Sequence, residues 1–212
     1  MVSAADAFVR LREGNQRFVS GAHHAETLPH DARRAALIAD QRPFAIVLGC
    51  SDSRVPAELV FDQGLGDLFV IRVAGNIVAP SQVGSVEFAA ERFGTRLVVV
   101  LGHSQCGVIL ATLEELQRHS GNHSHNMRTI VDRVRPSVEG LLATNLRHEP
   151  DALVREAVRA NIRASADHLR HGSEVLEHLI RKDGLVVVGA EYSLATGVVD
   201  FFDGPPTLLP VS

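Results

Sequence analysis

Two short clusters of the sequence hold residue types that bind metal ions in proteins. The first, residues 50–54, contains Cys50, Asp52 and Arg54, and the second, residues 103–106, contains His103 and Cys106. Two thiolates, an imidazole and a carboxylate suit Zn²⁺, which accepts sulfur, nitrogen and oxygen ligands in a tetrahedron. If the fold brings the two clusters together, the sequence predicts a zinc site.

The residue types alone leave other interpretations open. Two cysteines in a chain of 212 residues are also typical of buried apolar positions or of a disulfide. The paired Cys-x-x-Cys spacing of structural zinc sites is absent from the sequence. Without the neighbouring cysteine, Asp52 and Arg54 would be interpreted as an ordinary surface ion pair.

An apolar run ended by a glycine precedes each cluster, residues 44–48 before the first and residues 97–101 before the second. Continuous apolar runs of this length predict buried parallel strands. The carboxyl ends of such strands meet at the crevice where open α/β sheets bind ligands. We therefore expect the two clusters to lie side by side. Further strands are predicted over residues 68–73 and 185–188, with an edge strand over residues 196–202.

Helices are predicted between these strands. The expected ranges are 3–21, 31–39, 82–93, 106–118 and 151–180, the last interrupted near Gly172. Cys106 is expected in the first turn of its helix, where the helix dipole favours a thiolate. Residues 119–126 are predicted to form a solvated polar loop that includes His123 and His125. The alternation predicts a single α/β domain over residues 1–212, with residues 1–40 as an N-terminal helical arm.

Composition narrows the possible partners. The net charge of −4 gives no reason to expect nucleic acid or an anionic membrane as a partner. No apolar stretch approaches the length that spans a bilayer, and residues 1–6 lack the features of a secretory signal. We therefore expect a cytoplasmic protein, whose thiols stay reduced and available to a metal ion.

Six motifs spread over nearly the whole chain resemble those of the β-class carbonic anhydrases. They are residues 14–18, 50–56, 66–76, 84–89, 102–107 and 189–192. The two metal-ligand motifs occur together and in the order of that family, which makes the resemblance specific.

The resemblance implies that Cys50, His103 and Cys106 bind a catalytic zinc ion and that Asp52 is a conditional fourth ligand. It implies a mostly parallel sheet flanked by helices, with the N-terminal helix packed on a partner subunit in a homodimer or homotetramer. It further assigns three residues to the substrate pocket: Gln41 by its position before the first cysteine, Phe69 as an apolar wall, and the backbone N–H of Gly107.

The implied activity is the reversible hydration of carbon dioxide to bicarbonate and a proton. Zinc lowers the pKa of bound water from about 15.7 towards roughly 7, and the resulting hydroxide attacks carbon dioxide. Two thiolates cancel the charge of Zn²⁺, so the activity is expected to be greatest on the alkaline side. Asp52 either fills the fourth position on the metal or is held away from it by Arg54 in a charge-assisted pair.

The sequence departs from one subset of this family, and two other functions remain open for the same zinc site. Some members bind bicarbonate in a second pocket built from a tryptophan, an arginine and a tyrosine. Here Val47 replaces the tryptophan, whereas Arg72 and Tyr192 match the other two positions or serve as structural residues. The same zinc site would also suit hydrolysis of carbonyl sulfide or carbon disulfide. A non-catalytic protein with a structural zinc ion is the third possibility.

Overall fold

The computed structural model describes residues 2–23, 30–118 and 124–209. These residues form a five-stranded sheet in the order β2-β1-β3-β4-β5. The strands are β1 (Ala45–Gly49), β2 (Leu68–Arg72), β3 (Leu97–His103), β4 (Val186–Tyr192) and β5 (Val199–Asp203). The pairs β2–β1, β1–β3 and β3–β4 are parallel, and β5 pairs antiparallel to β4 at one edge. The predicted mostly parallel α/β sheet is confirmed.

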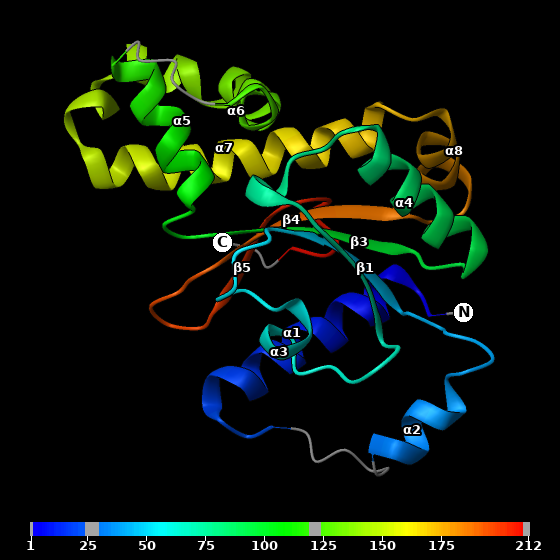
Figure 1. The fold of residues 1–212 in the computed structure, drawn as a ribbon. Helices are drawn as coiled ribbons and strands as arrows, with labels where there is room; N and C mark the ends of the chain where they lie inside the picture. The colour runs from blue at the N-terminus through cyan, green and yellow to red at the C-terminus, as the bar shows by residue number, and fades with distance from the viewer. Residues whose placement is uncertain (1, 24–29, 119–123, 210–212) are drawn as a thin grey trace.

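Helices cover both faces of the sheet (Figure 1). One face carries α1 (Ala4–Ser20) and α3 (Ala57–Val60), and the other carries α4 (Pro80–Arg92), α7 (Pro150–His171) and α8 (Glu174–Lys182). The helices α5 (Gly107–Arg118) and α6 (His125–Val138) pack beside α7, and α2 (His30–Ala36) precedes β1. Short 3₁₀ turns lie at η1 (Ala74–Asn76), η2 (Glu139–Ala143) and η3 (Asn145–His148).

The apolar runs form strands because both faces of the sheet are buried. Successive side chains of a strand point to opposite faces. Ile46 and Leu48 of β1 therefore belong to the core beneath α4 and α7, whereas Val47 belongs to the core beneath α1. In the parallel register Gly49 lies opposite Leu101, so β1 and β3 end at the same edge of the sheet. This register places the two clusters next to each other.

The start and end of α1 follow the local sequence. The Ser3 side chain accepts a hydrogen bond from the Asp6 N–H, which caps the helix, and Gly21 ends it in the left-handed conformation at φ 71°. Ala7, Phe8 and Leu11 bury the inner face of α1 against its own sheet. Val9 and Val19 remain exposed on α1, and its packing on a partner subunit stays a prediction.

Several predicted boundaries were wrong. Cys106 precedes α5 instead of lying in its first turn, and its carbonyl accepts the Leu110 N–H. The loop predicted over residues 119–126 lies partly outside the described residues, and its end is helical because Ser124 caps α6 at His125. The rest of α6 was not predicted either, because Pro136 is atypical of a helix interior. β4 extends beyond residue 188 to Tyr192, and α2 ends at Ala36 instead of residue 39.

Gly14 of α1 lies against the chain that follows α3. A Cβ atom built on Gly14 would meet the Phe61 carbonyl oxygen at 1.8 Å, and neither backbone segment can give way by that much. We expect Gly14→Ala to lower the free energy of unfolding by about 2–3 kcal/mol, as overpacking does. Gly84→Ala in α4 is the control, because its Cβ would meet nothing within 4 Å. In urea denaturation, the control should show a free energy of unfolding higher by about 1 kcal/mol, because alanine has a higher helix propensity than glycine. Equal effects of the two substitutions would contradict this packing.

None of the helices in the described residues is long and apolar enough to cross a membrane.

Candidate metal centre

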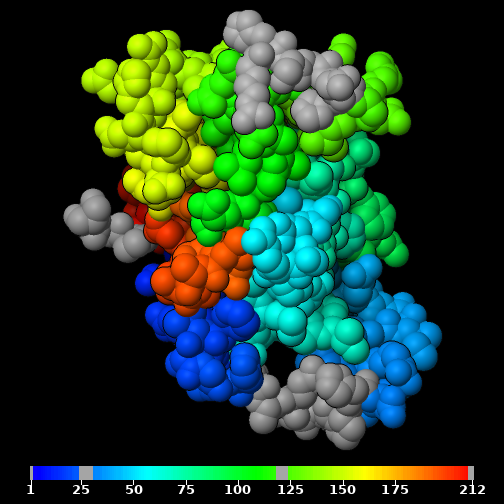
Figure 2. Space-filling model, turned by 60° about the vertical axis from the view of Figure 1, so that its left-hand side comes forward, coloured from blue at the N-terminus to red at the C-terminus, as the bar shows by residue number. Residues whose placement is uncertain are grey.

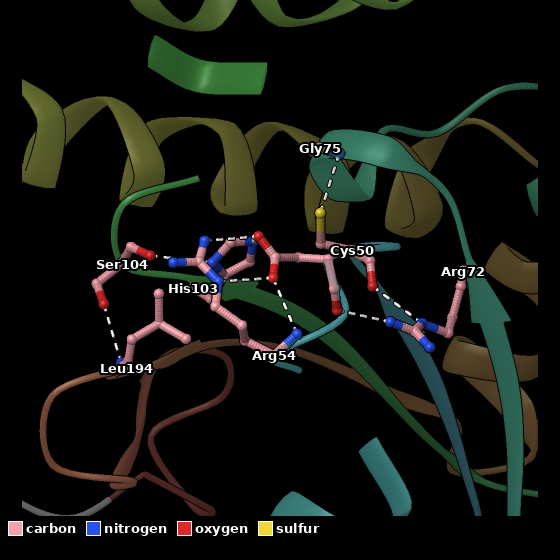
Figure 3. Close-up of polar contacts among 8 residues, drawn as sticks. Cys50, Arg54, Arg72, Gly75, His103, Ser104 and Leu194 are labelled. Atoms are coloured by element: carbon pink, nitrogen blue, oxygen red, sulfur yellow. Dashed lines mark hydrogen bonds and ion pairs between the residues drawn. The ribbon is translucent and has the colours of Figure 1, made fainter. Parts of the chain in front are cut away.

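Cys50 lies directly after β1 with its sulfur buried beneath the turn that follows β2. The Gly75 N–H donates a hydrogen bond of 3.3 Å to the Cys50 Sγ (Figure 3). Gly75 adopts φ 72°, and a Cβ atom there would meet Val108 Cγ1 at 2.9 Å. A glycine at this position therefore allows the backbone to approach both the sulfur and α5.

His103 is the last residue of β3, and its side chain is 0% exposed. Its Nδ1 lies 2.9 Å from the Ser104 carbonyl oxygen, a contact that places the proton on Nδ1 and leaves Nε2 as an acceptor. Among the described residues Nε2 is buried and has no hydrogen-bond partner. A buried nitrogen of this kind needs a ligand, and a metal ion would satisfy it.

Ser104 ties the end of β3 to the loop after β4. Its N–H donates to the Tyr192 carbonyl at 3.0 Å, and its Oγ accepts the Leu194 N–H at 3.0 Å. Figure 2 shows the green segment after β3, the cyan segment after β1 and the orange connection between β4 and β5 meeting on one face of the molecule. Three separate segments therefore hold the centre in place.

Cys106 reaches the centre through the tight turn at Gln105, whose φ is 55°. The Cys106 thiol donates to Cys50, and this contact lowers the pKa of Cys50 to about 4, against the opposing effect of burial. The same contact, together with burial, raises the pKa of Cys106. The contact therefore favours the thiolate form at Cys50 over that at Cys106.

The ligand atoms of Cys50, His103 and Cys106 all lie within 4.8 Å of one another. Burial lowers the pKa of His103, but the adjacent Cys50 outweighs burial and raises that pKa. Since a coordinating thiol must be deprotonated, a bound ion would displace the proton of Cys106. Two sulfurs and one imidazole nitrogen converging in a buried site fit Zn²⁺.

Asp52 and Arg54 form a two-point ion pair beside these three residues. Arg54 donates from Nε to Asp52 Oδ1 at 2.9 Å and from Nη2 to Oδ2 at 2.7 Å. These hydrogen bonds hold the pKa of Asp52 well below its usual value of 3.8. Asp52 Oδ2 also lies 3.8 Å from His103 Nε2, so the carboxylate is held at the edge of the centre.

Arg72 fixes the backbone between the first cysteine and the ion pair. Its Nε donates to the Cys50 carbonyl at 3.1 Å and its Nη2 donates to the Asp52 carbonyl at 2.7 Å (Figure 3). Tyr192 is buried against Phe18 of α1. Both contacts favour the structural interpretation of these residues. The contacts of Ser104 could not be predicted, because backbone donors and acceptors leave no trace in residue type.

The three residues assigned to the substrate pocket lie in different places. Gly107 begins α5 directly after Cys106. Phe69 lies on β2 with its ring 6.2 Å from that of Phe88 and 6.0 Å from that of Phe93. Gln41 is exposed before the start of β1, whereas Cys50 follows the end of that strand. Gln41 is therefore separated by the length of β1 from the centre of its own chain.

Comparisons with known proteins agree with this centre. A sequence model of the family described as carbonic anhydrase matches residues 45–199. Carbonic anhydrase 2 of Mycobacterium tuberculosis is 38% identical over 193 residues, which cover 90% of this chain and 89% of that protein. Carbonic anhydrase of Mycolicibacterium smegmatis is 39% identical over 196 residues, which cover 92% of this chain and 91% of that protein.

Solved structures show the same fold. The β-carbonic anhydrase CafA of Aspergillus fumigatus superposes with a TM-score of 0.73 at 26% identity and covers 82% of each chain. The β-carbonic anhydrase CcaA superposes with a TM-score of 0.72 at 27% identity, covering 95% of this chain and 94% of that one. With the family match over most of its length and a Cys-His-Cys centre at the ends of β1 and β3, the chain belongs to the β-class carbonic anhydrases.

Proposed function

We propose that this protein catalyses the reversible hydration of carbon dioxide with a zinc ion held by Cys50, His103 and Cys106. The observation that carries the proposal is the convergence of these three ligand atoms within 4.8 Å, one of them a buried nitrogen without a partner among the described residues. When bound, zinc supplies a Lewis acid that makes water a strong nucleophile at moderate pH. No observation favours hydrolysis of carbonyl sulfide or carbon disulfide, or a purely structural zinc ion.

Asp52 and Arg54 control access to the metal in this proposal. Arg54 holds both oxygens of the Asp52 carboxylate, so Asp52 stays off the fourth position. An ionised carboxylate only accepts hydrogen bonds. Asp52 Oδ2 would therefore accept a hydrogen bond from the reacting water and so turn an oxygen lone pair towards carbon dioxide. The contacts support this role because Oδ2 lies on the side of His103 Nε2.

The proposed substrate pocket needs a second copy of the chain. Gln41 lies at the opposite end of β1 from Cys50, which supports its placement in the pocket of a partner subunit and not of its own chain. It borders a surface groove together with Ile38, Leu65 and Phe93, and both Ile38 and Leu65 are exposed apolar side chains. The two exposed apolar side chains beside Gln41 support a homodimer, alone or within a homotetramer. Phe69 would form the apolar wall of the pocket, and the Gly107 N–H would bind bicarbonate.

A stopped-flow assay of carbon dioxide hydration by the zinc-loaded protein tests the proposed function. Because Arg54 holds the pKa of Asp52 below 3.8, Asp52 stays ionised throughout the neutral range. We expect activity to rise from acid to alkaline pH because of the water activated by the metal, without a contribution from Asp52. A flat profile, or faster turnover of carbonyl sulfide than of carbon dioxide on the same preparation, would contradict the proposal.

Mixed assemblies test whether Gln41 acts across the subunit interface. Gln41→Ala should lower kcat/KM by about tenfold, as loss of a positioning contact does. Cys106→Ser should inactivate the site of its own chain. In a heterodimer of the two variants, the Gln41→Ala chain keeps its ligands and receives Gln41 from its partner. The heterodimer is purified through two different tags, one on each variant. We expect it to recover about half the wild-type activity. Failure to recover any activity would show that Gln41 acts within its own chain.

The remaining parts of the proposal concern organisation and location. We propose that residues 1–212 fold as one domain, since the two apolar cores share one sheet, and that residues 1–40 serve as a helical arm towards the partner. We further propose a cytoplasmic location, which would keep the two free cysteines reduced for metal binding.

A further inference from the structure

The turn that contacts Cys50 has an unusual backbone. Gly75 and Asn76, in η1, both adopt positive φ values, 72° and 43°. This conformation costs conformational free energy at Asn76, because a Cβ atom disfavours the left-handed region. The turn nevertheless delivers the Gly75 N–H to the Cys50 Sγ at 3.3 Å. Such a conformation persists only when its surroundings over-determine it.

Two buried side chains of α7 hold this turn from the opposite side. Asn161 Nδ2 donates to the Gly75 carbonyl at 2.8 Å, and Ser165 Oγ donates to the Asn76 carbonyl at 3.0 Å. The two residues are four positions apart and so lie on the same face of the helix. They are 2% and 5% exposed, so water has little access to either hydrogen bond. Figure 1 shows α7 running across this face of the sheet next to the turn.

We propose that Asn161 and Ser165 are positioning residues of the metal centre. By fixing both carbonyls of the Gly75–Asn76 turn, they keep the Gly75 N–H directed at the Cys50 sulfur before a metal ion binds. Without them the turn and the sulfur would have to be ordered at the moment of binding, which costs affinity. This inference rests on the zinc site proposed above and extends it to α7, more than 80 residues along the chain from the turn.

A purely structural role for these side chains predicts a different result. Hydrogen bonds from buried side chains to backbone carbonyls stabilise a fold wherever they occur. Thr95 provides the matched control, because its buried hydroxyl donates to the Pro43 carbonyl at 2.8 Å. Thr95 lies two residues before β3 and Pro43 two residues before β1, at the opposite end of the sheet from the metal centre. Thr95→Val should lower stability without changing metal binding.

Zinc affinity of the full-length protein tests the proposal through competition with a chromophoric chelator. We expect Asn161→Ala and Ser165→Ala each to weaken zinc binding by about tenfold, within the range found for outer-shell partners. Ser165→Thr keeps the hydroxyl that donates to the Asn76 carbonyl and should therefore bind zinc as tightly as the wild type. Because both side chains act on the same turn, the double variant should lose less than the product of the single losses.

Cobalt substitution adds a spectroscopic readout of the Cys50 sulfur. The sulfur-to-cobalt charge-transfer band should shift in both alanine variants and stay unchanged in Thr95→Val, because only the former release the Gly75 N–H. If wild-type protein binds no zinc, the proposed function itself fails. If wild-type protein binds zinc, and the alanine variants bind it equally well with an unchanged cobalt spectrum, Asn161 and Ser165 serve only the fold and the inference is overturned.

Discussion

Replacement of Arg54 by alanine is expected to lower kcat/KM for carbon dioxide hydration by about 10–100-fold while one zinc ion per chain stays bound. The physical reason is the two-point hydrogen bond that holds Asp52. Arg54 contacts both carboxylate oxygens, at 2.9 and 2.7 Å, and among the described residues no other side chain donates a hydrogen bond to them. Without the Arg54 guanidinium, the Asp52 carboxylate keeps only the hydrogen bond of 3.0 Å from the backbone N–H of residue 54 to its Oδ1, so Oδ2 can move onto the metal and exclude water from the fourth position.

Anion binding distinguishes a blocked metal from a misfolded site. We expect cobalt-substituted Arg54→Ala to bind azide more weakly than wild-type protein, because the carboxylate of Asp52 competes for the same position. Arg181→Ala is the control, since Arg181 makes a similar ion pair with Glu177 at 2.8 Å on the exposed surface of α8. That variant should keep full activity and full azide binding. Full activity in Arg54→Ala would show that Arg54 does not restrain Asp52.

Replacement of Cys106 by serine is expected to abolish hydration and to weaken zinc binding by more than about 100-fold, the upper end for loss of an outer-shell partner. A serine hydroxyl fits the same buried space but is a poor ligand for zinc at neutral pH. The remaining Cys50 and His103 would leave two protein ligands for the ion. Metal analysis after dialysis, with chelator competition, measures the loss.

Thr112→Val is the control for replacing a buried side chain. Thr112 lies on α5, the helix that begins directly after Cys106. Thr112 is fully buried and its hydroxyl donates to the Val108 carbonyl of the same helix at 2.8 Å. We expect this variant to keep its zinc and most of its activity, even if its stability falls. Retention of one zinc ion per chain at wild-type affinity in Cys106→Ser would exclude Cys106 as a ligand.

The meeting of the two clusters was predictable because the chemistry-bearing residues directly follow buried strands. Continuous apolar runs identified β1 and β3, and the parallel arrangement placed Cys50 and His103 at the same edge of the sheet. The two ends of α1 were equally predictable. The Ser3 side chain caps the first turn and Gly21 tolerates the left-handed conformation, and both effects depend only on residue type. What depends on residue type and short-range spacing was therefore accessible from the sequence.

The supporting contacts of the centre were not accessible in the same way. Ser104 and the Gly75 carbonyl held by Asn161 act through backbone atoms, which every residue type has. The partnership of Asn161 with Gly75 also joins positions far apart in the sequence, and only the packing of α7 on the sheet brings them together. The helix α6 was missed because Pro136 interrupts its pattern, although the structure retains the helix to Val138.

A crystal structure of the zinc-loaded protein at alkaline pH tests the central claim most directly. The claim predicts zinc bound to the sulfurs of Cys50 and Cys106 at about 2.3 Å and to Nε2 of His103 at about 2.0 Å. It also predicts that the Asp52 carboxylate remains on Arg54 and that water completes the tetrahedron. A metal ion bound elsewhere, or an Asp52 oxygen in the fourth position under these conditions, would contradict it.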